Sequence, residues 1–288
     1  MQRRLWHAPT GTYRLDTVSD AIAAETYNRR MPRFAANLSF LFTERPFLER
    51  FAAARATGFV AVEFHFPYDF DRAALAEVAM TSGLEVVLFN LSAGDWAAGE
   101  RGIACHPWRI AEFQDGVGQA IEYARLLGCA KLNCLAGIAP GDINHDKARE
   151  TLIENLRFAA AVTRRAGIEL LLEPINTRDT PGYFVATTRA ALALIKAVGS
   201  DNLRLQYDIY HAQAMEGDLA RTLQEHLPHI GHVQLADNPG RHEPGSGEIN
   251  FPFLLRHLDR IGYAGWVGCE YMPSGRTEDS FGWMESWR

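Results

Sequence analysis

The sequence of 288 residues contains only four cysteines, and none of them forms a Cys-x-x-Cys pair. Zinc sites and redox sites built from cysteine usually contain such pairs. Cys129, Cys134 and Cys269 lie in or beside apolar runs that are typical of a protein core. We therefore expect reduced, buried thiols in a cytoplasmic protein, with disulfides or a metal–thiolate site as the alternative.

Long hydrophobic runs are also missing. No segment approaches the roughly 18 apolar residues needed to span a bilayer, so we expect no membrane protein. Residues 1–30 carry arginines but lack the apolar stretch of about seven residues that a secretory signal contains. The first strong strand pattern follows Met31. Residues 1–30 are therefore expected to be an N-terminal extension of uncertain status: an upstream segment, a start codon placed too early, or a weak transit peptide.

An excess of positive charge is absent as well. The 29 Lys and Arg residues are outnumbered by 35 Asp and Glu residues, which gives a net charge of −6. A nucleic-acid surface needs clustered Lys and Arg to neutralise phosphates. We therefore expect a small-molecule substrate and no nucleic-acid partner, while a homo-oligomer stays open.

Short apolar runs alternate with longer amphipathic ones from Met31 onward. Buried parallel strands are expected to be rich in Val, Ile, Leu and Phe, and eight runs have this character. They cover residues 34–40, 60–66, 85–91, 130–137, 168–176, 203–210, 230–237 and 266–271. Helical patterns lie between them, for example at 46–57, 109–128 and 145–166, and Asp71 is typical of a helix N-cap.

Eight strand–helix units in a single domain, residues 31–288, predict an α/β fold of the (β/α)₈ TIM-barrel class. A doubly wound sheet is the alternative. That fold usually has a glycine-rich phosphate turn after its first strand, and here the corresponding residues read LSFLFTERP. We find no GxGxxG or GxxxxGK[ST] motif at a strand–helix junction.

Four polar residues lie at the ends of four consecutive predicted strands, where the active sites of such barrels are built: Glu173, Asp208, Gln234 and Glu270. Each could cap a helix or pair with an arginine. Each follows an apolar run, so we expect all four to be partly buried, where an unpaired charge needs a cation or full hydrogen bonding. Three carboxylates and one amide suit a hard divalent metal, Mg²⁺ or Mn²⁺.

Two of these carboxylates can also transfer protons. If Glu173 and Glu270 approach an α-hydroxycarbonyl compound from two sides, one can remove a carbon-bound proton and the other can return it to the neighbouring carbon. A metal that chelates the substrate oxygens would stabilise the enediolate between the two steps. This chemistry is aldose–ketose isomerisation.

Histidines offer further candidates. His211, three residues after Asp208, is expected to hydrogen-bond a substrate hydroxyl. His232 lies two residues before Gln234 on the same strand face, and is either a ligand or a core histidine. His65 and His106 are weaker candidates.

Two long polar loops follow predicted strands three and seven. Residues 94–107, GDWAAGERGIACHP, present Arg101, with Trp96 able to shield a site from water. Residues 237–250, DNPGRHEPGSGEIN, present Arg241. Either arginine could form a paired hydrogen bond with a substrate carboxylate, or simply face the solvent.

The chain from Met31 onward resembles the hydroxypyruvate isomerase family of xylose-isomerase-like barrels. The resemblance covers all eight units and rests on FAANLSFLF, FVAVEFHFPYDF, NLSAGDWAAGERGIAC, KLNCLAG, LLLEPIN, LQYDIYHAQAMEGDL, IGHVQLADNPGRHEPGSGEINF and GWVGCEY. It implies interconversion of hydroxypyruvate and 2-hydroxy-3-oxopropanoate (tartronate semialdehyde), or isomerisation of 2-oxo-tetronates as the alternative.

The resemblance also implies roles for individual residues. The acid/base pair falls on Glu173 and Glu270, and the metal site on these two with Asp208 and Gln234. The substrate contacts fall on Asp179, His211 and Arg241. Related ketose epimerases have histidine where this chain has Gln234, so an amide replaces a stronger donor there.

Other functions share some of these features. A ketose 3-epimerase would use the same metal and glutamates but would not need to bind a carboxylate. An abasic-site endonuclease of the same superfamily would need several zinc-binding histidines and a basic groove, which the net charge opposes. A non-catalytic sensor of sugar acids would show no turnover.

Overall fold

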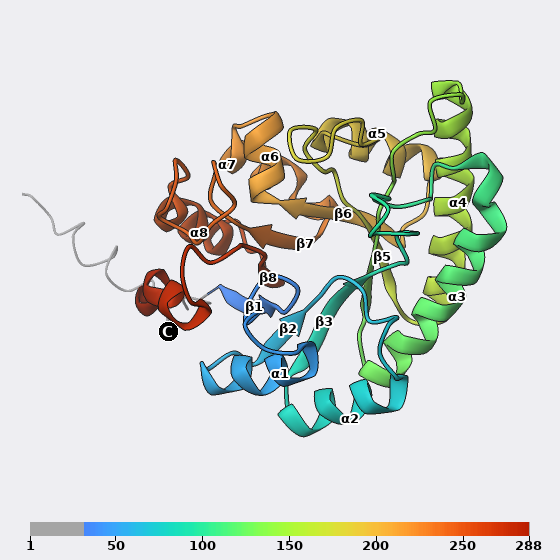
Figure 1. The fold of residues 1–288 in the computed structure, drawn as a ribbon. Coiled ribbons are helices and arrows are strands. Elements are labelled where there is room, and N and C mark those ends of the chain that lie inside the picture. The colour runs from blue at the N-terminus through green and yellow to red at the C-terminus, as the bar shows by residue number, and fades with distance from the viewer. Residues whose placement is uncertain (1–31, 288) are drawn as a thin grey trace, which may run out of the picture. The chain divides into compact units, whose positions relative to one another are not determined.

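The computed structural model describes residues 32–287, and the predicted extension at 1–30 lies outside them. Eight parallel strands form a closed barrel in chain order, with β1 pairing with both β2 and β8 (Figure 1). The predicted (β/α)₈ barrel is therefore confirmed. The strands are β1 (Arg33–Asn37), β2 (Ala61–Glu63), β3 (Glu85–Asn90), β4 (Lys131–Cys134), β5 (Glu169–Leu172), β6 (Leu203–Asp208), β7 (Ile230–Leu235) and β8 (Trp266–Cys269).

Helices surround the strands on the outside of the barrel, as Figure 1 shows. They are α1 (Phe47–Ala56), α2 (Arg72–Ser82), α3 (Ile110–Leu127), α4 (His145–Arg165), α5 (Thr188–Val198), α6 (Ile209–Met215), α7 (Leu219–His226) and α8 (Phe251–Arg260). Three 3₁₀ helices add to them: η1 (Pro107–Arg109), η2 (Leu227–His229) and η3 (Thr277–Trp287). The sixth strand is thus followed by two helices, and η3 takes the place of an α-helix after β8.

Local sequence explains where the helices begin and end. The Asp71 side chain accepts a hydrogen bond from the Ala74 backbone N–H at 2.9 Å, which confirms the predicted N-cap of α2. Gly83 ends the same helix in the left-handed conformation that favours glycine. Among the described residues, no helix has the length and apolarity that crossing a membrane requires.

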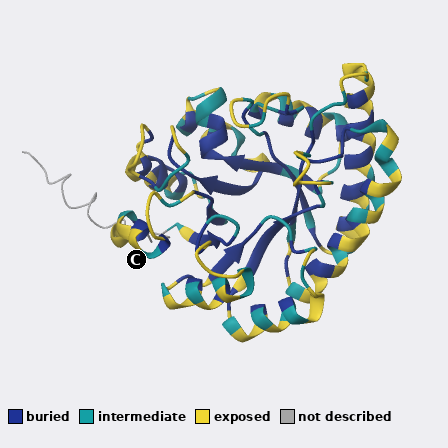
Figure 2. Cartoon of the chain, in the orientation of Figure 1, coloured by how far each residue is buried: buried dark blue, intermediate teal, exposed yellow. Residues whose placement is uncertain are grey.

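The main hydrophobic core lies between the barrel and its helices. The strands are buried almost throughout, whereas the helices bury one face and expose the other (Figure 2). A smaller apolar group includes Ala35, Val87 and Leu171. Polar side chains on the strands are therefore buried as well, and the structure must provide each of them with a partner.

Candidate active site

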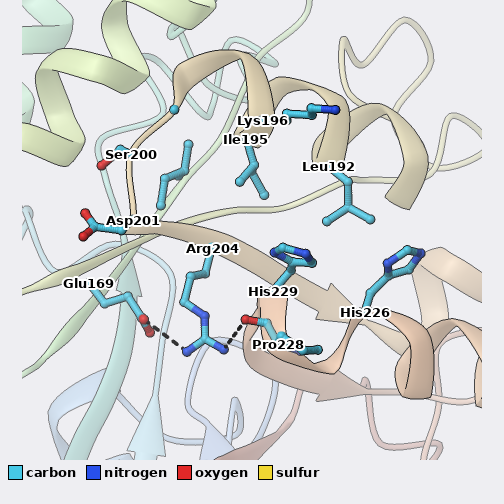
Figure 3. Close-up of a pocket in the computed structure, with 12 residues that line it drawn as sticks. Glu169, Leu192, Ile195, Lys196, Ser200, Asp201, Arg204, His226, Pro228 and His229 are labelled. Atoms are coloured by element: carbon cyan, nitrogen blue, oxygen red, sulfur yellow. Dashed lines mark hydrogen bonds and ion pairs between the residues drawn. The ribbon is translucent and has the colours of Figure 1, made fainter.

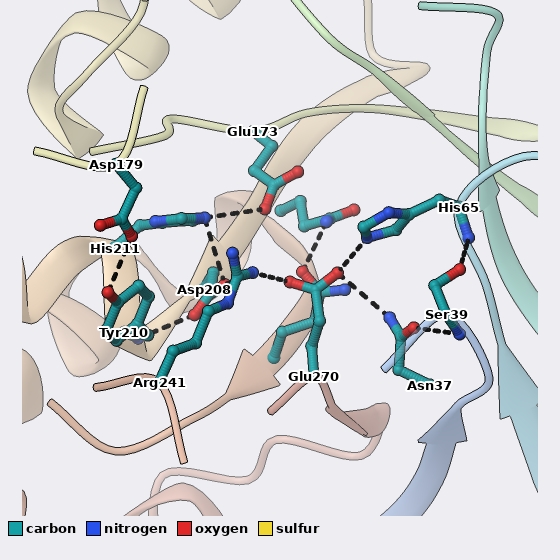
Figure 4. Close-up of polar contacts among 12 residues, drawn as sticks. Asn37, Ser39, His65, Glu173, Asp179, Asp208, Tyr210, His211, Arg241 and Glu270 are labelled. Carbon is teal, nitrogen blue, oxygen red and sulfur yellow. Dashed lines mark hydrogen bonds and ion pairs between the residues drawn. The ribbon is translucent and has the colours of Figure 1, made fainter. Parts of the chain in front are cut away.

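Four acidic and histidine side chains meet at the carboxyl end of the barrel. Glu173 directly follows β5, Asp208 ends β6, His211 lies in the first turn of α6, and Glu270 directly follows β8. One potential ligand atom from each lies within 4.8 Å of all the others, and all four residues are buried. Figure 4 shows their side chains pointing toward one another.

Arg241 brings a positive charge to this group, which we call the acidic cluster (Glu173, Asp208, His211 and Glu270). Its Nη2 donates to Glu270 Oε2 and, at 3.4 Å, to Asp208 Oδ2. The guanidinium lies over the rings of Phe40 and Tyr210, at 4.7 and 5.2 Å from their centroids. Arg241 has a φ of +58°, so the loop after β7 holds it in an unusual backbone conformation.

A single guanidinium does not balance the carboxylates. Burial, together with Glu270 and Asp208, raises the pKa of Glu173 well above its usual value. Burial also raises the pKa of Asp208 to about 7, although Arg241 opposes the shift. For Glu270, burial would raise the pKa, but Arg241 and His65 lower it to about 2. Two of three buried carboxylates thus lack sufficient positive charge.

The acidic cluster therefore fits a divalent cation by its chemistry. Carboxylate oxygens are the donors that hard cations prefer, and the cluster is short of positive charge. His211 offers Nε2 at 3.5 Å from Asp208 Oδ2, while its Nδ1 accepts from Asn176 Nδ2 at 2.7 Å. The described residues thus provide a group that could hold a metal ion, as the sequence predicted in outline.

Further side chains hold the two glutamates in place. Asn133 Nδ2 donates to Glu173 Oε2 at 2.7 Å. Glu270 Oε1 lies 2.8 Å from His65 Nε2 and accepts from Asn37 Nδ2 at 3.1 Å. Both carboxylates are consequently fixed from the side of the barrel wall.

The predicted substrate residues do not all reach the same space. A cavity of about 140 Å³ is lined by residues that include Glu173, Glu270, His211, Arg241 and Arg101. Arg101 also donates to the backbone carbonyls of its own loop, at 2.8 and 3.2 Å, and stacks 3.9 Å from the Trp96 ring centroid. Asp179, the substrate residue predicted after strand five, lies outside this lining.

Asp179 is exposed and is not among the residues that line this cavity. It accepts hydrogen bonds from Asn176 Nδ2 at 3.0 Å and from the Tyr210 hydroxyl at 2.7 Å. Asn176 also contacts His211, so a chain of hydrogen bonds connects Asp179 to the acidic cluster. Its predicted substrate contact stays a prediction.

Gln234 lies in register beside Asp208 on the neighbouring strand, and it is buried. Its Nε2 donates to Glu63 Oε1 at 2.7 Å, and its Oε1 accepts from Gln206 Nε2 at 2.6 Å. His232 is a buried core histidine whose Nε2 lies 2.7 Å from Glu63 Oε2. The predicted metal role of Gln234 stays a prediction.

Sequence reasoning missed the polar residues that lie within strands, above all Asn37, Glu63 and Asn133. Each interrupts an apolar run, and each is almost fully buried. A polar residue inside a strand that is buried on both faces requires a partner, so the signal was present in FAANL, VAVEF and KLNC. The partners, however, lie in or directly after other strands, so spacing along the chain cannot identify them.

A larger hollow of about 890 Å³ lies at the other end of the barrel, between α5 and the turn before β7. Figure 3 shows Arg204 between Glu169 and the backbone carbonyl of Pro228. Arg204 donates to Glu169 Oε1 at 3.3 Å and to two backbone carbonyls. Because Glu169 and Asp201 each pair with an arginine, this hollow lacks the unbalanced carboxylates of the acidic cluster.

The fold and the acidic cluster define a metal-compatible barrel of the isomerase type, and sequence comparison agrees. Residues 51–287 match the model of the xylose isomerase-like TIM barrel, so the chain belongs to that family. The hydroxypyruvate isomerase of Escherichia coli (strain K12) is 53% identical over 258 residues, which cover 90% of this chain and 100% of that protein. The predicted resemblance is confirmed.

Other relatives bear different names. A 2-oxo-tetronate isomerase of Cupriavidus necator is 48% identical over 255 residues, which cover 88% of this chain and 98% of the relative. A crystal structure titled AP endonuclease, family 2, from Brucella melitensis is 48% identical, with a TM-score of 0.87, and the match covers 90% of this chain and 100% of that one. The crystal structure of the 3-keto-D-glucoside 4-epimerase of E. coli is 22% identical, with a TM-score of 0.72. This match covers 89% of this chain and 100% of that one, and it shows the fold alone.

Proposed function

We propose that the protein is an isomerase that interconverts hydroxypyruvate and 2-hydroxy-3-oxopropanoate. The observation that carries the proposal is the convergence of Glu173 and Glu270, which directly follow β5 and β8, on one small cavity beside Arg241. Two carboxylates and one guanidinium are the groups that proton transfer within a small oxo acid requires. The names of the relatives at 53% and 48% identity support the same reaction class.

The reaction moves one proton between neighbouring carbons. A carboxylate takes a proton from C3 of hydroxypyruvate, and the electron pair forms the double bond of an enediolate between C2 and C3, with the negative charge on the C2 oxygen. A carboxylic acid then delivers a proton to C2, while the proton of the C3 hydroxyl passes to the C2 oxygen, so that C3 becomes the aldehyde and C2 bears the hydroxyl. Glu173 and Glu270 supply these two groups, and their roles exchange in the reverse direction.

The remaining residues bind and orient the substrate. Arg241 pairs with the substrate carboxylate, and Arg101 approaches from the loop after β3. His211 hydrogen-bonds a substrate oxygen, held in place by Asn176. Glu173, Asp208, Gln234 and Glu270 would hold Mg²⁺ or Mn²⁺, which when bound polarises the substrate oxygens and stabilises negative charge on them.

Hydroxypyruvate, the three-carbon acid, is the first candidate substrate, because the relative at 53% identity bears that name. The four-carbon acid is the second candidate, because a relative at 48% identity bears that name.

The free thiols of all four cysteines also agree with a cytoplasmic enzyme, where thiols remain reduced. This part of the proposal is independent of the chemistry at the barrel mouth.

Proton NMR in D₂O tests the proposal directly. Purified protein with Mg²⁺ should convert hydroxypyruvate to tartronate semialdehyde and exchange the C3 protons for deuterium. Glu173→Gln and Glu270→Gln should each reduce turnover at least about 100-fold, because general acid–base catalysis contributes roughly 10²–10⁴-fold. Glu169→Gln, at the other end of β5, is the matched control and should retain turnover. Undiminished turnover in both site variants would reject the mechanism.

A further inference from the structure

Glu63 is a carboxylate inside the barrel, fully buried and distant from the solvent. It accepts three hydrogen bonds: from Asn37 Nδ2 at 3.0 Å, from Gln234 Nε2 at 2.7 Å and, at 2.7 Å, from His232 Nε2. The carboxylate of this β2 residue also fills the space beside Gly268 of β8, where an added Cβ would lie 2.2 Å from Glu63 Oε1. Glu63 therefore connects β2 to β1, β7 and β8.

The proposed function gives Glu63 no role, yet its partner Asn37 also donates to Glu270, and its partner Gln234 lies in register beside Asp208. We propose that Glu63 is a positioning residue that determines which end of the Gln234 amide faces the metal site. The inference rests on the proposed role of Gln234 as a metal ligand. It assigns to Glu63 an effect on metal affinity without any contact between Glu63 and the ion.

The chemical argument begins with the amide group. Its oxygen and nitrogen ends have nearly the same shape, but only the oxygen can bind a hard cation. A carboxylate can only accept hydrogen bonds, so the end of Gln234 that faces Glu63 must be the NH₂ group. The oxygen is therefore turned toward β6, where it accepts from Gln206 Nε2 at 2.6 Å. That strand also carries Asp208.

Glu63 itself is held by donors on its other sides. His232 Nδ1 has no hydrogen-bond partner, so the tautomer that fits has its proton on Nε2 and donates to Glu63 Oε2. Asn37 Nδ2 donates both to Glu63 Oε1 and to Glu270 Oε1, at 3.0 and 3.1 Å. Glu63 thus reaches the acidic cluster by two routes, Gln234 and Asn37.

A glutamine that binds a metal ion needs a neighbour that fixes the orientation of its amide group. An amide that can flip would present a donor to the cation in half of its orientations, and its affinity for the ion would fall. A carboxylate behind it removes the ambiguity. Loss of such an outer contact typically weakens metal affinity about 10–100-fold.

Exchange of the two groups tests the inference. We would remove the metal from four proteins: the wild type, Glu63→Gln, Gln234→Glu and the double variant. The binding of Mn²⁺ to each is then measured by the loss of the EPR signal of free Mn²⁺. Each single variant should bind Mn²⁺ at least about 10-fold more weakly. In Glu63→Gln the amide opposite Gln234 can donate or accept, so it no longer determines which end of Gln234 faces it. In Gln234→Glu two buried carboxylates face each other, and the proton that one of them must carry competes with the ion. The double variant restores one donor and one acceptor, so it should bind more tightly than either single variant.

Controls separate this effect from damage to the fold. The melting temperature of each metal-free protein is recorded, and Glu169→Gln removes a carboxylate at the other end of the barrel and should leave the Mn²⁺ affinity within about 2-fold. If Glu63→Gln does not fold, the comparison of Gln234→Glu with the double variant still decides. If the loss of Mn²⁺ affinity in the double variant equalled the sum of the losses in the single variants, the inference about Glu63 would be wrong, while the proposed metal site would stand. A wild-type protein that binds no Mn²⁺ would overturn the proposed metal site as well.

Discussion

His65 Nε2 lies 2.8 Å from Glu270 Oε1, so the residue that follows β2 by two positions contacts the carboxylate at the end of β8. The Glu270 side chain is only 4% exposed, whereas that of His65 is 22% exposed and lies at the cavity. Together with Arg241, His65 lowers the pKa of Glu270 despite its burial. The histidine therefore helps to keep Glu270 ionised and in a fixed orientation.

Replacement of His65 by phenylalanine should lower kcat about 10–100-fold while KM changes less, because the ring packing is kept and only the hydrogen bond to Glu270 is lost. Phe40 and Trp96 would still contact the new ring. Steady-state kinetics with hydroxypyruvate measure both constants. His106→Phe is the control, since His106 contacts the Ile138 carbonyl in a loop. Equal kcat values for His65→Phe and wild type would show that the contact has no catalytic effect.

Asp237 shapes the loop that carries Arg241. Its buried carboxylate accepts hydrogen bonds from the backbone N–H groups of Asn238, Gly245 and Ile249 at 2.9, 2.8 and 3.1 Å. The Arg241 N–H also donates to the Asp237 backbone carbonyl at 3.0 Å. The position of the guanidinium therefore depends on a residue that does not line the cavity.

Asp237→Asn should destabilise the protein by about 1–3 kcal/mol, because the new NH₂ group faces at least one backbone N–H that then lacks an acceptor. It should also raise KM for hydroxypyruvate, since Arg241 loses its fixed position. Urea denaturation and initial rates measure the two effects. Glu248→Gln, on the same loop, is the control and should leave KM within about 2-fold. An unchanged KM together with lower stability would limit Asp237 to a structural role.

The sequence was sufficient to predict the barrel because each strand is a compact apolar run and each helix has recognisable ends. Glu173, Asp208 and Glu270 were predictable for a related reason: parallel strands bring their carboxyl ends to one rim, so position along the chain predicts position in space. The resemblance to a known family added Asp179, which no pattern had indicated. In the structure that residue contacts Asn176 and Tyr210.

The network around Glu63 could not be predicted in the same way. Its side chain reaches Gly268 and Gln234, which lie on strands near the end of the chain. Gln234 is 171 residues away from Glu63 in the sequence. Whether an inward polar residue meets an amide, a histidine or empty space depends on the shear of the closed barrel. His232 illustrates the difficulty, because sequence alone left it open between a ligand and a core histidine.

All four cysteines should be unreactive in the native protein. Each is free and buried, and burial raises the pKa of both the Cys105 and the Cys129 thiol to about 12. The thiolate is the reactive form, so little of it exists at pH 8. Titration with a chromogenic disulfide reagent should detect almost no thiol in the folded protein and four in urea. Rapid reaction of the native protein would contradict the burial of these side chains.

Gly268→Ala should be far more harmful than a glycine-to-alanine change at a position where an added Cβ has space. A Cβ at this position would meet Glu63 Oε1 at 2.2 Å, and the carboxylate is held on its other sides by Asn37, Gln234 and His232. Overpacking of this kind costs about 1–3 kcal/mol, measured here by urea denaturation.

Gly118 in α3 is the matched control, because an added Cβ there meets nothing within 4 Å. Gly118→Ala should stabilise the protein by about 0.5–1 kcal/mol, since alanine is the better helix former. If Gly268→Ala were tolerated equally well, Glu63 would have to be free to move aside. The close fit between the two residues would then not be what holds the carboxylate beneath the site.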